Sequence, residues 1–136
     1  MRAFHLQPGM TTLRGVFYPT GYMVLMFPTE AHAREAERRL MADGQDGQSI
    51  LFMSPQCVLD ELAPTAGEEE PLPSLGTEAD TVRHFVQLAR RGHYGLMLRS
   101  PSPDSTEHVM ALLHDLPISF GQKYRRLVIE DLVTLH

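Results

Sequence analysis

Residues 21–44 read GYMVLMFPTEAHAREAERRLMADG and contain one complete structural unit. Its first part, residues 22–27, is a continuous apolar run of strand length. Thr29 stands where the N-cap of a helix is expected, directly before Glu30. Small and apolar residues then recur at helical spacing until Gly44 ends the pattern. The stretch therefore predicts a strand, a tight capped turn and a helix.

The same arrangement returns in the second half of the chain. Residues 94–98 form an apolar run, and Pro101 and Ser105 lead into a helical pattern that ends near Leu113. The whole order is strand, helix, strand, then two inserted helices, then strand, helix, strand. Two such βαβ units favour an α+β fold of ferredoxin-like type. We expect a four-stranded antiparallel sheet with right-handed crossovers and with helices on one face.

The remaining elements complete a single domain over residues 1–136. Residues 49–53 and 124–129 predict the other two strands, and residues 54–62 and 77–91 predict the inserted helices. A chain of 136 residues is long enough to bury a core without a disulfide or a structural metal. The single cysteine excludes an internal disulfide framework.

Three segments lie outside this pattern. Residues 1–12 contain a Pro8-Gly9 breaker, and we expect them to form a flexible N-terminus. Residues 13–18 either pair with the following strand or form a loose arm. Residues 64–76 combine the acidic run at 68–70 with prolines, so they predict a surface loop inside the domain.

The charge balance limits the classes of partner. The net charge is -5, and the excess of acids lies in residues 1–76. This argues against general nucleic-acid binding, which needs a broad basic surface. No stretch approaches the roughly 18 apolar residues of a membrane span, and the N-terminus lacks the apolar region of a signal peptide. We therefore expect no membrane partner and a cytoplasmic location.

The first predicted strand, residues 22–27, is apolar on both of its faces. A sheet with only one covered face would alternate polar and apolar residues along such a strand. Something must therefore cover the second face. We expect the inserted helices, especially residues 78–91, to cover part of it, and a homodimer that packs through this face is equally open.

Chemistry-bearing residues are few and scattered. Of the seven histidines, His108 and His114 are six residues apart and point in different directions on a helix, so we expect no metal site. No nucleotide-binding, hydrolase or metalloprotease motif is present, and we predict no cofactor and no catalytic residue. A speculative apolar ligand cleft is lined by Tyr22, His84, His93 and Tyr94.

Two local features each have two interpretations. Cys57 is in the first turn of the helix at 54–62, where a helix dipole can lower a thiol pKa, but no base is nearby and a buried inert thiol is favoured. Residues 100–106, SPSPDST, precede a helix and offer backbone amides to an anion. Asp104 and Glu107 already supply negative charge there, so ordinary capping is favoured.

Six basic residues are concentrated in the last third of the chain. The third and fourth predicted strands bring some of them close together in space. They form either a solvated strand edge or a binding surface for an acidic partner. That partner is another molecule or the chain's own acidic residues 68–70. The six are Arg90, Arg91, Arg99, Lys123, Arg125 and Arg126.

Two stretches carry a resemblance to known families. Residues 21–27, followed by an Ala/Glu/Arg-rich helix and a glycine turn, resemble small bacterial general-stress-type proteins of ferredoxin-like build. Residues 124–132, YRRLVIEDL, resemble uncharacterised proteobacterial proteins of about this length. The resemblance covers residues 21–132 and carries over no catalytic residue.

Three functions from different classes remain. We expect a non-enzymatic regulatory or stress-associated interaction module that self-associates or binds an acidic protein. The alternative is a small-ligand-binding protein or a small enzyme with a pocket between sheet and helices. RNA binding is disfavoured, because residues 94–98, YGLML, are too apolar for an RNA-recognition strand.

Overall fold

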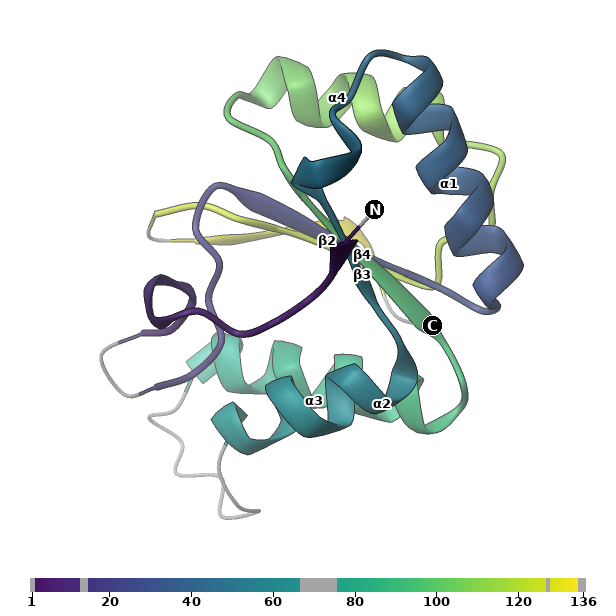
Figure 1. The fold of residues 1–136 in the computed structure, drawn as a ribbon. Helices are drawn as coiled ribbons and strands as arrows, with labels where there is room; N and C mark the ends of the chain where they lie inside the picture. Colours follow the sequence, from purple (N-terminus) through teal and green to yellow (C-terminus); the bar gives the residue numbers. More distant parts are fainter. Residues whose placement is uncertain (1, 13–14, 67–75, 127, 135–136) are drawn as a thin grey trace.

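The computed structural model describes residues 2–12, 15–66, 76–126 and 128–134. Its strands form one sheet and its helices pack against that sheet, which gives an α+β fold (Figure 1). The strands are β1 (Arg2–Ala3), β2 (Tyr22–Phe27), β3 (Ile50–Met53), β4 (Tyr94–Arg99), β5 (Phe120–Tyr124) and β6 (Ile129–Val133). The helices are α1 (Glu30–Ala42), α2 (Pro55–Cys57), α3 (Gly76–Arg90) and α4 (Pro103–Leu112).

The prediction of a four-stranded antiparallel sheet of ferredoxin-like type is wrong. The sheet has six strands in the order β1-β3-β4-β2-β5-β6, and it is mixed because β1 pairs parallel with β3. The other neighbouring strands pair antiparallel. The two strands at the edges, β1 and β6, were missed because an edge strand has one partner and need not be apolar on both faces.

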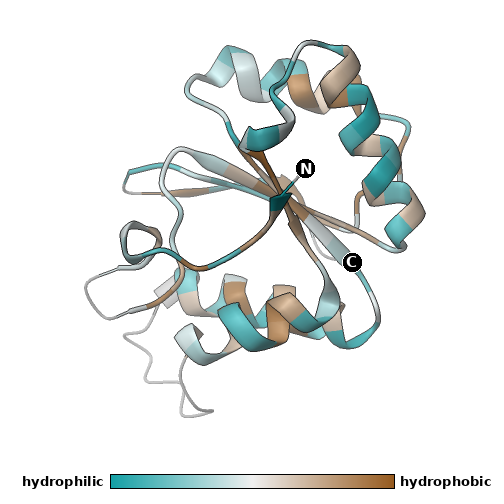
Figure 2. Ribbon diagram, viewed as in Figure 1, coloured by the Kyte–Doolittle hydropathy of each residue, from teal (hydrophilic) through white to brown (hydrophobic). Residues whose placement is uncertain are grey.

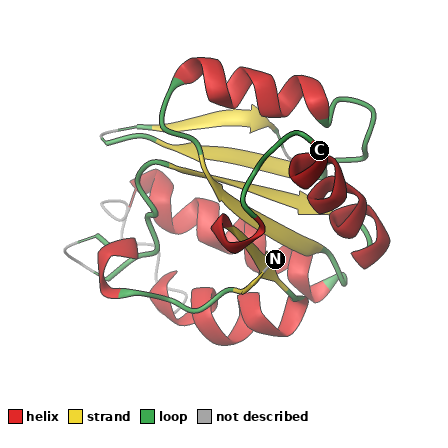
Figure 3. Cartoon of the chain, turned by 45° about the horizontal axis from the view of Figure 1, so that its top comes forward, coloured by secondary structure: helices red, strands yellow, loops and turns green. Residues whose placement is uncertain are grey.

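Helices cover both faces of the sheet (Figures 1 and 3), and the helices of the two βα units, α1 and α4, share one face as predicted. Helices α1 and α4 pack on the face formed by Met23, Leu25 and Phe27. On the other face, Val24 and Met26 lie in one cluster with residues of α3 and of the helical turns that follow α2. The inserted helices therefore cover the second face, as expected, and apolar residues line the strands between the layers (Figure 2).

The predicted last strand, residues 124–129, does not form as one strand. Tyr124 instead ends β5 and Ile129 begins β6, and the two residues pair across these antiparallel strands. The sequence pattern does not predict β5, because its sequence, FGQKY, has a glycine and two polar residues where a buried strand is usually apolar. Gly121 is needed there: a Cβ at this position would lie 2.9 Å from Leu25 Cδ2.

The predicted helix boundaries around the two βα units agree with the structure. Thr29 caps α1 by accepting a hydrogen bond from the His32 amide. Gly44, just beyond the helix, has φ of 101°, a conformation that glycine adopts without strain. Helix α2 is shorter than the predicted helix at 54–62 and continues as a π-helical turn, Val58–Leu62.

The segment expected to be a flexible N-terminus carries β1 and contributes to the core. Phe4 is 1% exposed, and its ring packs edge-on against Phe17 with a centroid separation of 5.8 Å. The Phe4 amide donates a 2.8 Å hydrogen bond to the carbonyl of Phe52 in β3. Residues 13–14 and 67–75, which belong to the predicted arm and loop, lie outside the described residues.

We predict that Phe4→Ala lowers the free energy of unfolding by about 3 kcal/mol, because it removes a buried ring and leaves a cavity. Urea denaturation measures the change. Gln7→Ala is the matched control, since Gln7 is exposed, and it should change stability by less than about 0.5 kcal/mol. Equal stability of the two variants would mean that residues 1–12 do not pack on the domain.

Candidate functional site

A cleft of about 250 Å³ opens where β4 and β5 end. Both strands flank β2 and run antiparallel to it, so their last residues lie at the same end of the sheet. We call this site the cationic cleft, because a lysine and two arginines line it. Its lining residues are Thr20, Gly21, Ser100, Pro101, Ser102, Pro103, Lys123, Tyr124, Arg125 and Arg126.

Backbone hydrogen bonds hold the walls of the cationic cleft together. The Gly21 amide donates to the carbonyl of Tyr124 at 2.8 Å, and the Ser100 amide donates to the carbonyl of Gly21 at 2.9 Å. Gly21 has φ of 87°, which side chains other than glycine rarely adopt. The segments before β2, after β4 and at the end of β5 are therefore fixed relative to one another.

Lys123 is the buried charged group of the cationic cleft. The residue is 6% exposed and pairs with Met23 across β5 and β2. Its Nζ donates to the carbonyl of Ser100, and within the described residues no carboxylate forms an ion pair with it. Burial lowers the pKa of Lys123 from its usual value, the charge of Arg125 lowers it further, and Glu130 opposes both.

Hydroxyl groups form the wall next to α4. Ser102 caps the helix by accepting from the Ser105 amide at 3.1 Å, and Ser105 Oγ accepts from the Ser102 amide. The Ser100 hydroxyl is buried and contacts the hydroxyl of Thr106 at 2.5 Å. The structure thus confirms capping of α4, and these hydroxyls are already engaged with one another.

Two exposed arginines line the cationic cleft, and we call this exposed part of the cleft its mouth. Arg125 pairs with Glu130 on β6, with 2.9 Å between Nη2 and Oε1. Tyr18 Oη donates to the Arg125 carbonyl at 2.6 Å and thereby fixes the backbone at the mouth. Arg126 is exposed, and no carboxylate of the described residues pairs with it. Its guanidinium is the group most available to an arriving anion.

The structure divides the six basic residues that the sequence singled out. Arg99 ends β4 beside the start of β2, at the same end of the sheet as the three basic residues of the cationic cleft. Arg90 and Arg91 precede β4 and lie at the opposite end of the sheet. The acidic run at 68–70 lies outside the described residues.

The four residues of the speculative ligand cleft do not line one site. Tyr22 begins β2 and Tyr94 pairs with Phe27 at its other end, so the two tyrosines are a strand length apart. His84 packs edge-on against Phe120 at 5.4 Å. His93 Nδ1 contacts the Ser119 hydroxyl at 2.8 Å. The two histidines and Tyr94 therefore share one end of the sheet, away from Tyr22 and from the cationic cleft.

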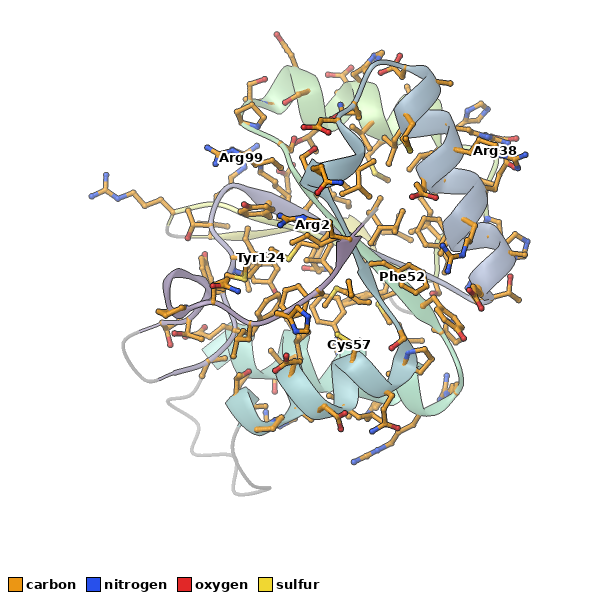
Figure 4. The ribbon with its side chains drawn as sticks, viewed as in Figure 1. Arg2, Arg38, Phe52, Cys57, Arg99 and Tyr124 are labelled. Carbon is orange, nitrogen blue, oxygen red and sulfur yellow. The ribbon has the colours of Figure 1, made fainter. Side chains whose placement is uncertain are left out.

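Cys57 lies near the N-terminal segment, on the side of the sheet that carries α2 (Figure 4). Its Sγ is 3.5 Å from the carbonyl of Phe4. Burial, assisted by the charges of Glu61 and Asp60, raises the pKa of the thiol from 9.0 to about 11. The protonated thiol is therefore the form present near neutral pH, in agreement with the inert interpretation.

The described residues contain neither a metal-ligand cluster nor a membrane-spanning helix. Among the described residues, no group of three or more His, Cys, Asp or Glu side chains is arranged to hold a metal ion. Nor does any described helix combine the length and the hydropathy that crossing a bilayer requires.

Comparison with known proteins found no matching protein family, no matching curated protein and no matching solved structure. The resemblance to stress-type bacterial proteins stays a prediction.

The burial of Cys57 gives a direct chemical test. Because raising a thiol pKa from 9.0 to about 11 depletes the reactive thiolate, we predict that iodoacetamide alkylates the folded protein about 100-fold more slowly than the urea-unfolded protein at about pH 8. Intact mass measures the rate without ambiguity, since Cys57 is the only cysteine. Equal rates in the two states would show that the thiol is exposed and ionises normally.

Proposed function

We propose that this protein is a binding module that holds a small anion, a carboxylate or phosphate group, in the cationic cleft. The observation that carries the proposal is the burial of Lys123 without a carboxylate partner among the described residues. Of the functions that the sequence left open, the small-ligand binder is the one that this geometry supports best.

The energetics favour an anion over a neutral ligand. A buried ammonium is destabilising when its only partner is a neutral carbonyl, because desolvation removes the water that stabilises the charge. A bound carboxylate or phosphate supplies the missing counter-charge and forms charge-assisted hydrogen bonds with Nζ. Arg126 at the mouth attracts anions from solution. Both effects act only on a negatively charged ligand.

The size of the cleft restricts the ligand to a small molecule. At about 250 Å³ it is smaller than the usual range for drug-sized ligands. Its lining combines Pro101 and Pro103 with Lys123, the two arginines and the hydroxyl-bearing residues next to α4. A short organic acid meets these conditions, with its acid group toward Lys123.

The other expected functions stay proposals with less support. An interaction module that binds an acidic protein would use Arg99 and the cleft arginines, which lie at one end of the sheet. No feature of the described residues favours a role in stress, self-association or a cytoplasmic location. Because helices pack on both faces around β2, the uncovered apolar face that suggested a homodimer is not found in the described residues. The same helices occupy the surface on which RNA bases would stack.

We predict that lactate binds at millimolar concentration and shifts the backbone amide resonances of Gly21, Ser100 and Tyr124. Arg126→Gln should weaken binding about 3- to 10-fold, because it removes one charge from the mouth. NMR titration measures both effects. Arg90→Gln is the matched control: it removes the same charge from the opposite end of the sheet and should leave the affinity unchanged.

Raising the salt concentration should weaken lactate binding in the same titration, since exposed charges at the mouth are screened. The proposal fails if lactate shifts no cleft resonance, or if Arg90→Gln and Arg126→Gln weaken binding equally. The second outcome would mean that only the net charge of the protein attracts the anion.

A further inference from the structure

Lys123 is the only lysine in the chain. The other eleven of the twelve basic residues are arginines, and among the basic residues that the structure describes the lysine is the buried one. It also lines the cationic cleft. The only side-chain amine of the chain therefore belongs to a residue of the cleft wall, and it contacts the carbonyl of a second wall residue, Ser100.

Lysine and arginine differ in the chemistry that they offer at such a position. Both can bind an anion as a cation, but a guanidinium stays protonated in proteins. A lysine can lose its proton when burial disfavours the charge, and the neutral amine is a nucleophile toward carbonyl carbons. Anion binding alone does not require this property.

We infer that Lys123 is the attachment point for a small anion that also carries a ketone or aldehyde, such as a 2-oxo acid, and that its ε-amine forms an imine with that carbonyl group. The inference rests on the proposed function, because the anionic group is what brings the ligand into the cationic cleft. It adds a reversible covalent bond to that binding.

The step needs no further reagent. The deprotonated Nζ attacks the carbonyl carbon and forms a C–N bond, which gives a carbinolamine. The carbinolamine then loses its hydroxyl group as water and a C=N bond forms. Summed from the ammonium form, one ammonium and one carbonyl compound give one protonated imine and one water, so atoms and charge balance.

The surroundings of Lys123 suit this reaction. Its described polar contact is the carbonyl of Ser100, which accepts a hydrogen bond but does not hold the ammonium as a carboxylate would. Burial and the neighbouring Arg125 both lower the pKa of Lys123. Glu130, which opposes this shift, is paired with Arg125 at 2.9 Å. Each of these features favours the free amine.

The test compares pyruvate with lactate, which differ in having a ketone or a hydroxyl group at the same carbon. The folded full chain is incubated with pyruvate and cyanoborohydride, which reduces an imine to a stable secondary amine. Intact mass and peptide mapping then locate the adduct. Since the chain has one lysine, the only two candidate amines are Lys123 and the α-amino group.

We expect one reduced pyruvate adduct at Lys123, formed at least about 10-fold faster in the folded than in the urea-unfolded protein. An excess of lactate should slow it by competing for the cationic cleft. Lys123→Arg should abolish this adduct and leave labelling of the α-amino group in place. Peptide mapping of the adduct on the unaltered chain tests the inference even where the Lys123→Arg variant does not fold.

The outcomes separate this inference from the proposed function. If lactate shifts the cleft resonances but pyruvate labels only the α-amino group, the anion site stands and the imine is overturned. Labelling of Lys123 at equal rates in folded and unfolded protein also overturns it, because that is ordinary amine chemistry. If neither acid perturbs the cleft and no adduct forms, both proposals fall.

Discussion

Strand β2 is buried on both of its faces, and the arrangement of helices in two layers follows from that burial. Its residues from Met23 to Phe27 are fully buried, with successive side chains in two different apolar clusters. A strand of this kind is stable only between two layers, because a solvent-exposed face would leave large apolar side chains in water. Helices α1 and α4 supply one layer, and α3 with the turns after α2 supplies the other.

The position of the cationic cleft follows from the strand directions around β2. Since β4 and β5 are both antiparallel to β2, they finish together beside its first residues. Side chains alternate along β5, so Phe120 and Tyr124 join the cluster around α3 while Lys123 points toward the opposite layer. There it meets Ser100, which follows β4 and precedes α4. The fold thus brings one amine and one helix start together at one end of the interior strands.

Local signals in the sequence were sufficient for β2, α1, β4 and α4, because each combines an apolar pattern with a cap or a glycine stop. They were not sufficient for β1 and β6, whose strand state depends on a partner far away in the chain. The basic group was partly predictable: Arg99 and Lys123 do lie at one end of the sheet, but Arg90 does not, since it precedes β4. No local sequence pattern predicts the burial of Lys123, although the sequence does show that it is the only lysine.

Strand β5 concentrates polar groups that a stable sheet would avoid. Two of the three buried side-chain atoms without a partner among the described residues, Gln122 Nε2 and Tyr124 Oη, are on this strand, on either side of Lys123. Each such group lowers stability, because its desolvation is not compensated by a hydrogen bond. Proteins keep violations of this kind mainly at functional sites, where the residue's chemistry outweighs its effect on folding. By alternation Gln122 and Tyr124 face the α3 layer and Lys123 faces the other, so β5 carries polar groups into both layers, and the charged one among them belongs to the cationic cleft.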